Sequence, residues 1–496
     1  MVFTSIAFVK FFALFACLFL LARNRGQRQL VVLGASIVFY GSWNARYLLL
    51  LATPSIIDYY CALKIEATES PRLRKTILFI SIASNLGLLA YFKYTNFLLS
   101  TFSELLHLPH RTLDILLPVG ISFYTFKTMS YTVDVYRGEL RACRSWWKYA
   151  MFVTYFPELV AGPIVRASVF LPQMGRSLRF DGNRLLLGLQ IILLGVTKKI
   201  VIADRLAPFA DHVFAAPGSF DGMTNALAVV AYSLQIYCDF SGYSDIAIGI
   251  SKIIGYDLPE NFNMPYLAAN LTDFWRRWHI TLSSWLRDYL YIPLGGNRKG
   301  KTRTNINLIL TMLLGGLWHG ASWTFVFWGL LHGIGLMFHK YLGTRKPTSR
   351  LSQLAGWAMT YGYVCLAWIF FRASSFPLAL TMLRKIVTLD ATGVRWVFTP
   401  LLIIIPLVVA AHFIGVHAAR LYATARRGAR KVTAPALFEP LYGTSGTIVR
   451  KPSAAAGIYV LLPIQPFWNG FVVAAWVLAV FSFSATSSNP FIYFQF

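Results

Sequence analysis

Long apolar runs recur along the whole chain, and they restrict its fold more than any other feature. The clearest runs lie at residues 5–22, 76–92, 186–197, 225–237, 305–318, 322–338, 354–371, 396–411 and 471–482. Several approach the roughly 20 residues that a helix needs to cross about 30 Å of hydrocarbon. Only 13% of the 496 residues are charged, against about 25% in a soluble domain. The sequence therefore predicts an all-α, multi-pass membrane protein.

The basic residues set the predicted topology. The formal net charge is +26, and Lys and Arg gather in short loops between the apolar runs. The main clusters lie at residues 23–28, 72–75, 141–148, 176–184, 298–303, 345–350 and 420–431. Because Lys and Arg are enriched in cytoplasmic loops, this pattern predicts about 11–12 transmembrane helices with both termini outside. The charge also favours anionic lipid headgroups, and we interpret it as topology, not as a signal for nucleic acid.

One segment has the composition of membrane but is broken by proline. Residues 137–184 contain "YFPELVAGPIV", in which Pro157 and Pro163 interrupt an apolar stretch too short to cross. Irregular backbone at membrane depth is tolerated only inside protein or around a water-filled cavity. We therefore expect a re-entrant segment here, with Glu158 as a buried acidic residue.

Residues 270–292, "NLTDFWRRWHITLSSWLRDYLYI", predict an interfacial helix. Apolar and aromatic side chains recur at helical spacing, while Arg276, Arg277 and Arg287 fall on the other side and His279 lies at the seam. A helix with an aromatic face and an Arg-rich face lies in the plane of the membrane surface. This helix either anchors the chain to lipid or forms the floor of a cavity that accepts an anionic, cytoplasmic donor. The sequence leaves both readings open.

The stretch "GGLWHGASWTFVFWGLLHG", residues 315–333, carries two histidines inside apolar sequence. His319 lies sixteen residues beyond Arg303, which is about 24 Å along a helix. An ionisable residue this deep in the membrane is a functional-site hypothesis by default, and imidazole exchanges protons near neutral pH. We therefore predict a catalytic role for His319. For His332 we favour a hydrogen-bonded core histidine.

Residues 232–250, "YSLQIYCDFSGYSDIAIGI", place two carboxylates in an apolar span. Asp239 and Tyr243 share one helical face, and Asp245 lies further along the same segment. These side chains either line the same cavity as the histidines or form a structural polar network between helices. The five cysteines are scattered without metal-ligand spacing, so we predict no metal site.

Together, these stretches resemble the membrane-bound O-acyltransferase (MBOAT) superfamily, in its bacterial alginate O-acetyltransferase-like branch. The resemblance is carried by residues 117–138, 156–166, 232–250, 260–300 and the "GGLWHG" motif at 315–320. It implies that His319 is the catalytic histidine and His279 the second functional one. It also implies a thinned central core, with an acyl donor on the cytoplasmic side and an acceptor outside.

The resemblance implies a division of the chain into three parts. N-terminal transmembrane helices occupy 1–114, the MBOAT catalytic core 115–345, and C-terminal transmembrane helices 346–496, with a basic cytoplasmic loop at 417–462. We expect the protein to lie in a bacterial inner membrane. In this reading Arg276, Arg277 and Arg287 bind the donor, and Asp239, Tyr243 and Asp245 line the cavity.

The expected activity is O-acetylation of an exported polysaccharide such as alginate. Acetyl-CoA is the expected donor substrate, and we predict no bound cofactor. Expected partners are membrane lipids, a periplasmic or membrane-tethered GDSL-type acetyltransferase and the polysaccharide biosynthesis machinery. D-alanyl transfer and acylation of peptidoglycan or cellulose are alternatives within the same fold. A polysaccharide exporter is the alternative from another class, although the inverted repeats typical of transporters are not visible.

Overall fold

The computed structural model describes residues 1–109, 112–175, 182–342, 349–428, 466–484 and 491–492. Within these ranges the chain forms helices and no β-strand, and a single isolated bridge joins Phe220 to Val394. The all-α prediction is confirmed. Four helical segments of the described chain are long and apolar enough to cross a membrane: Arg46–Ala67, Pro71–Leu105, Gly182–Ala215 and Arg350–Arg372. The number of crossings and the side of each terminus stay predictions.

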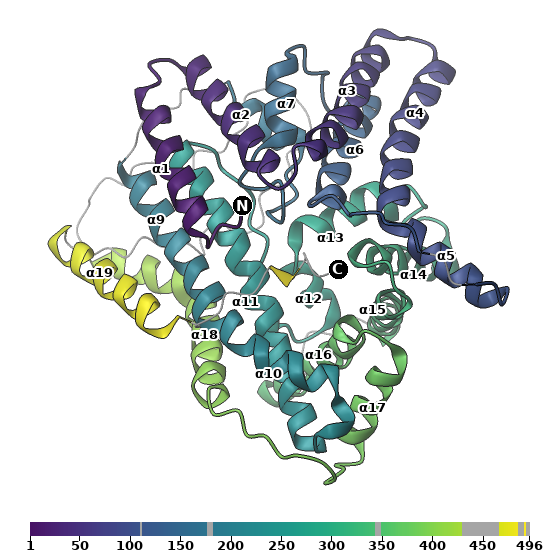
Figure 1. The fold of residues 1–496 in the computed structure, drawn as a ribbon, viewed down its shortest axis with the longest axis vertical. Helices are drawn as coiled ribbons and strands as arrows, with labels where there is room; N and C mark the ends of the chain where they lie inside the picture. The colour runs from purple at the N-terminus through teal and green to yellow at the C-terminus, as the bar shows by residue number, and fades with distance from the viewer. Residues whose placement is uncertain (110–111, 176–181, 343–348, 429–465, 485–490, 493–496) are drawn as a thin grey trace.

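Figure 1 shows the helices in chain order, with the longer connections between α5 and α6 and between α17 and α18. The first group is α1 (Ile6–Leu21), α2 (Arg25–Gly41), α3 (Arg46–Ala67), α4 (Pro71–Leu89), the π-helix η1 (Ala90–Tyr94), α5 (Thr95–Leu105), α6 (Ile121–Arg137), α7 (Trp146–Thr154) and α8 (Ala167–Gln173). The second group is α9 (Gly182–Val196), the π-helix η2 (Thr197–Ala203), α10 (Asp204–Ala215), the short 3₁₀ turn η3 (Pro217–Ser219) and α11 (Gly222–Ile254). The third group is the 3₁₀ turn η4 (Pro265–Leu267), α12 (Leu271–Arg277), α13 (Ile280–Leu286), the π-helix η5 (Arg287–Tyr291), α14 (Gly300–His319), α15 (Trp323–Leu342), α16 (Arg350–Arg372), α17 (Phe376–Val387), α18 (Leu401–Gly428) and α19 (Pro466–Phe483).

The long helix α11 is the central element, and glycines bring α9 close to it. A Cβ atom on Gly195 would lie 2.5 Å from the carbonyl oxygen of Gly242, and one on Gly188 would lie 2.7 Å from that of Gly249. Both distances are too short for a real Cβ contact. Small residues let membrane helices approach backbone to backbone, which increases their van der Waals contact. The two glycine pairs therefore fix the position of α9 on α11.

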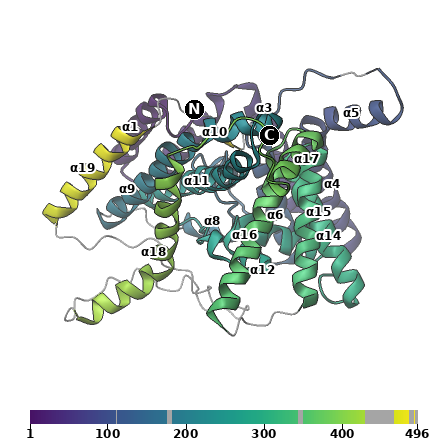
Figure 2. The ribbon, with the colours of Figure 1, turned by 90° about the horizontal axis from the view of Figure 1, so that it is seen from below.

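Helices α14, α15 and α16 run side by side along the short dimension of the molecule (Figure 2). Glycines again permit the contact between α14 and α15. A Cβ atom on Gly316 would collide with the carbonyl oxygen of Phe325, and one on Gly329 with that of Met312. This close approach holds the C-terminal end of α14, which carries His319, against α15.

The proline-interrupted segment between α7 and α8 is irregular and buried. Residues 155–163 form turns and no helix, and Phe156 and Ala161 are fully buried. Glu158 lies in this segment and forms an ion pair with Lys127 of α6, with both side chains buried. The irregular backbone is thus enclosed by protein, as predicted for a re-entrant segment.

The prediction of one continuous helix over 270–292 is wrong. The chain forms α12, breaks at Trp278 and His279, and continues as α13 and η5. Trp278 and Phe274 are each 1% exposed, so the aromatic face of this region packs inside the protein. In Figure 1, α12 and α13 lie between α11 on one side and α14 and α15 on the other. His279 at this break is fully buried and has a φ of 41°, which a continuous α-helix does not allow.

The basic segment at 417–462 is described only in part. Helix α18 extends to Gly428, so the beginning of the segment is helical. Residues 429–465 lie outside the described part of the chain.

We expect Gly195→Ala to destabilise the protein, because the added methyl group must push α9 away from α11. Overpacking of this kind costs about 1–3 kcal/mol. Gly34→Ala on α2 is the matched control, because no atom lies within 4 Å of the Cβ position there. Thermal unfolding of the purified variants in detergent measures the effect. Equal melting temperatures for Gly195→Ala and Gly34→Ala would contradict the packing described here.

Candidate active site

Two histidines that are forty residues apart in the chain meet in the core. His319 is the last residue of α14, and His279 lies in the break between α12 and α13. Their ring centroids are 6.4 Å apart, and the residues are 4% and 0% exposed. The structure therefore brings together the two residues that the sequence singled out for catalysis.

Aromatic rings surround the imidazole of His319. The ring centroids of Trp318, Trp328 and Phe371 lie 5.0, 5.1 and 5.4 Å away, and each ring is turned edge-on to the imidazole. These residues come from α14, α15 and α16, the three helices that run side by side. The enclosure restricts the orientation of the ring and keeps bulk water away from it. Such a site strengthens the polar interactions of a reacting group.

The hydrogen bonds of His279 define which of its nitrogens carries the proton. Its Nδ1 lies 3.1 Å from Oδ1 of Asn261. The same oxygen accepts hydrogen bonds from the backbone N–H and the hydroxyl of Thr281, which identifies it as the amide oxygen. Nδ1 of His279 is therefore the donor, and Nε2 carries the lone pair. Nε2 is buried and makes no hydrogen bond within the described residues, so a basic nitrogen remains available to a substrate.

The backbone at His279 is strained. Its φ of 41° and ψ of 54° place it in the left-handed region, which costs a residue with a side chain about 1–3 kcal/mol and is concentrated at functional sites. The Asn261 hydrogen bond and the edge-on ring of Phe240 at 4.6 Å hold the residue in place. The strain shows that packing, and not local preference, sets the position of this imidazole.

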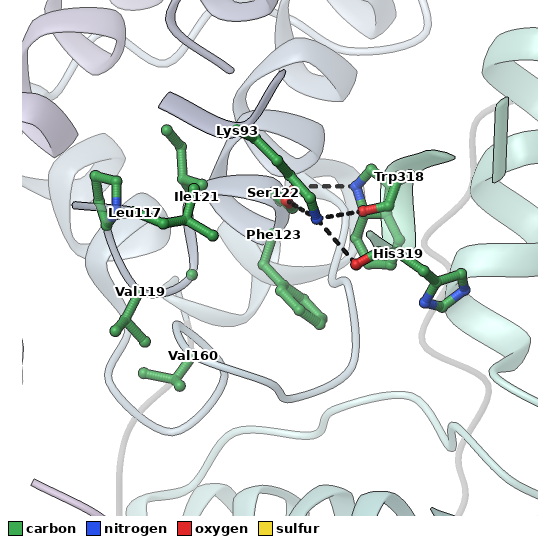
Figure 3. Close-up of a pocket in the computed structure, with 11 residues that line it drawn as sticks. Lys93, Leu117, Val119, Ile121, Ser122, Phe123, Val160, Trp318 and His319 are labelled. Atoms are coloured by element: carbon green, nitrogen blue, oxygen red, sulfur yellow. Dashed lines mark hydrogen bonds between the residues drawn. The ribbon is translucent and has the colours of Figure 1, made fainter. Parts of the chain in front are cut away.

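A small cavity adjoins the end of α14. It has a volume of about 120 Å³ and is lined by Lys93, residues 117–123, Val160, Trp318 and His319. Figure 3 shows that the backbone of His319 faces the ammonium group of Lys93, while the imidazole extends away from it. The cavity thus borders the backbone of His319 and not its ring.

The buried carboxylates on α11 have lysine partners on η2. Asp239 lies 2.6 Å from Nζ of Lys199, and Asp245 lies 2.6 Å from Nζ of Lys198. The backbone N–H of Ile492 also donates to Asp239, at 2.8 Å. Tyr243 packs with its ring 4.6 Å from that of Phe3. These contacts connect α11 to its neighbours, and each of them is distinct from the contacts of the histidine pair.

The three arginines considered for donor binding lie near the ends of α12 and α13. Arg277 forms an ion pair with Asp273 at 3.0 Å, and Arg287 forms one with Asp288 at 2.6 Å. Arg276 is exposed at the end of α12.

Within the described ranges, no group of three or more His, Cys, Asp and Glu side chains is arranged to hold a metal ion.

His332 is a buried, hydrogen-bonded histidine, as predicted. It is 0% exposed, and its Nδ1 accepts a hydrogen bond of 3.3 Å from Nε1 of Trp275.

The sequence analysis did not indicate two residues that contact the histidine pair, Asn261 and Lys93. Asn261 is one of several polar residues in a loop and carries no distinguishing signal. Lys93 does carry a signal in the sequence, because a lysine at the end of an apolar run is costly at membrane depth.

Comparison with known proteins identifies the family. The model of MBOAT, the membrane-bound O-acyltransferase family, matches residues 48–379. The chain is 39% identical to the "Probable alginate O-acetylase AlgI" of Azotobacter vinelandii over the full length of both. It is 39% identical to the peptidoglycan O-acetyltransferase of Helicobacter pylori, over 79% of each chain. It is 29% identical to the teichoic acid D-alanyltransferase of Bacillus subtilis, over 54% of this chain and 71% of that protein.

A family match over more than half of the chain, together with full-length relatives, defines an enzyme of the acyl-transfer class. The protein belongs to the membrane-bound O-acyltransferase family and is a multi-pass membrane O-acyltransferase.

We expect Lys199→Met to destabilise the protein strongly, because Lys199 is the cation between two buried carboxylates, Asp239 and Asp204. Removing one partner from a buried ion pair costs about 3–5 kcal/mol. Thermal unfolding in detergent is the measurement, and Lys10→Met, at an exposed position on α1, is the control. Adding Asp239→Asn to Lys199→Met should restore part of the stability. A Lys199→Met protein that melts with the wild type would contradict a structural role for this network.

Proposed function

We propose that this protein transfers an acetyl group from cytoplasmic acetyl-CoA to a hydroxyl acceptor on the outer side of a bacterial inner membrane. The acetyl group serves O-acetylation of an exported polysaccharide such as alginate. The observation that carries the proposal is the buried pair of imidazoles, His279 and His319, with ring centroids 6.4 Å apart in a site enclosed by aromatic rings.

In the proposed reaction His319 acts on the incoming hydroxyl group. As general base, its imidazole takes the hydroxyl proton while the oxygen attacks the carbonyl carbon of the thioester. The carbon–sulfur bond breaks, and the proton passes from the imidazole to the sulfur, which leaves as the free thiol of CoA. Alternatively, the imidazole nitrogen attacks the thioester first, the carbon–sulfur bond breaks, and CoA leaves as the free thiol with the imidazole proton. The hydroxyl oxygen then attacks the acetyl-imidazole, the carbon–nitrogen bond breaks, and the hydroxyl proton returns to the imidazole. The lone pair on Nε2 of His279 accepts a hydrogen bond from the substrate in either route.

The relatives favour acetyl transfer over D-alanyl transfer. The alginate and peptidoglycan acetylation enzymes are each 39% identical to the chain and cover 100% and 79% of it. The D-alanyltransferase match is 29% identical and covers 54%. Alginate is the favoured polymer because that similarity extends over the whole chain in several organisms.

The phosphate groups of acetyl-CoA are proposed to bind near Arg276, Arg277 and Arg287. An arginine fork donates two parallel hydrogen bonds to a phosphate. Arg276 is exposed, Arg277 is paired with Asp273, and Arg287 is paired with Asp288. These ion pairs orient the side chains before the donor arrives.

The acceptor side requires a partner, because the polymer itself is made and modified outside. A periplasmic or membrane-tethered GDSL-type acetyltransferase is the proposed recipient of the acetyl group, and it works with the polysaccharide biosynthesis machinery. Anionic lipid headgroups are the proposed neighbours of the basic loops.

We predict that His319→Ala lowers the rate of acetyl transfer by at least the 10²–10⁴-fold that general-base catalysis contributes. His212→Ala, at an exposed position on α10, is the matched control and should retain wild-type activity. Transfer of radiolabelled acetyl groups by purified, reconstituted protein measures the rate. A well-folded His319→Ala protein with normal activity would exclude the proposed mechanism.

We predict that Arg276→Lys, Arg277→Lys and Arg287→Lys raise the KM for acetyl-CoA more than they lower kcat, because lysine cannot reproduce the two-pronged contact. Loss of one hydrogen bond to a charged group corresponds to about a tenfold increase. Arg350→Lys, at the exposed start of α16, should leave the KM unchanged. If all three variants keep the wild-type KM, the donor binds elsewhere, and the basic loop at 298–303 is the next site to test.

A further inference from the structure

Helix α14 ends inside the protein, and its last carbonyl groups need donors from outside the helix. The backbone N–H of Gly320 closes the final turn by donating to Gly316. The carbonyl groups of Leu317, Trp318 and His319 follow, and no N–H group of the helix reaches them. A buried carbonyl without a partner costs free energy comparable to a lost hydrogen bond. The turn that carries the catalytic histidine therefore depends on other elements.

Two consecutive residues of η1 supply the missing donors. Nζ of Lys93 donates to the carbonyl oxygens of Trp318 at 2.6 Å and His319 at 3.0 Å. The hydroxyl of Tyr94 donates to the carbonyl oxygen of Leu317 at 2.9 Å. Each of the three carbonyl groups thus has one donor, and every donor comes from η1. Figure 3 shows the two bonds of Lys93 converging on the end of α14.

The donors of Lys93 are fully used within the protein. An ammonium group has three N–H donors, and the third contact of Lys93 is with Oγ of Ser122 at 3.4 Å. Lys93 is thus not available to bind an anionic substrate. Because the imidazole of His319 extends away from it (Figure 3), Lys93 acts through the backbone of the histidine.

Both donor residues, Lys93 and Tyr94, lie in a single π-helical turn. Residues 90–94 form a wide turn between α4 and α5, and single π turns inside helices occur frequently at functional sites. The turn places the side chains of Lys93 and Tyr94 on three successive carbonyl groups.

We propose that Lys93 and Tyr94 are positioning residues for acyl transfer: they hold the last turn of α14 so that the imidazole of His319 meets the donor and acceptor in a reactive geometry. This inference rests on the function proposed above for His319. A displacement of about 1 Å at a reacting group can lower a rate about 10²-fold. Loss of the η1 hydrogen bonds should therefore lower kcat and leave the KM for acetyl-CoA unchanged.

Lys93→Met, Tyr94→Phe and Lys93→Arg test the proposal in the purified, reconstituted full-length protein. Lys93→Met should lower kcat about 10²-fold at a wild-type KM for acetyl-CoA, and Tyr94→Phe should lower it less because one bond is lost. Lys93→Arg keeps the charge and the donors and should restore most of the activity. Tyr91→Phe is the matched control, because Tyr91 lies in the same π turn with 55% of its surface exposed, and it should behave as wild type.

A double variant separates positioning from general stability. If Lys93 acts through His319, then Lys93→Met adds no further loss of activity in a His319→Ala background. Additive losses would overturn the inference, as would a folded Lys93→Met protein with wild-type kcat. If Lys93→Met does not fold, Tyr94→Phe, alone and in the His319→Ala background, provides the same comparison. An inactive His319→Ala beside a fully active Lys93→Met refutes the positioning role alone, whereas an active His319→Ala refutes the proposed function itself.

Discussion

The end of a helix inside the protein leaves carbonyl groups without partners, and this constraint organises the centre of the molecule. Helix α14 ends at His319, and its last three carbonyl groups are bonded by Lys93 and Tyr94. Without those donors the final turn would lose either its hydrogen bonds or its position. Because the imidazole of His319, which we propose is catalytic, is attached to that turn, these backbone contacts also position the proposed general base.

The same rule applies to the other polar groups in the core. Asp239 and Asp245 are bonded to lysines on η2, and Glu158 in the irregular segment is paired with Lys127. Each pair connects two elements that are distant in the chain. Buried charges of this kind are costly to separate, since either partner alone would remain uncompensated. They join α11 to η2, and α6 to the irregular segment before α8.

The sequence predicted the all-α membrane class, the broken segment around Pro157 and Pro163, and two functional histidines, His279 and His319, which the structure places together in the core. Apolar run length, proline positions and buried ionisable residues each have a direct physical meaning, so these features can be read locally. The break at His279 was missed because the helical spacing of aromatic residues continues across it. The role of Lys93 was missed because its acceptors lie more than two hundred residues away, and no local pattern encodes that contact.

The position of the histidine pair suits the proposed transfer of an acetyl group from one side of the membrane to the other. Two buried imidazoles lie in a core that is enclosed by aromatic rings, and arginines lie near the ends of α12 and α13. A donor and an acceptor that approach from opposite faces would meet at this pair. The enzyme would then move only the acetyl group across the membrane, while CoA and the polymer stay on their own sides.

Sealed proteoliposomes with the protein inserted in one orientation test this claim most directly. Radiolabelled acetyl-CoA is supplied on the face of the 298–303 loop, and an alginate oligosaccharide with the GDSL-type transferase is enclosed on the other. If the protein moves only the acetyl group across the membrane, the enclosed oligosaccharide becomes labelled while intact acetyl-CoA stays outside. Labelling only of acceptors on the same side as the donor would contradict it.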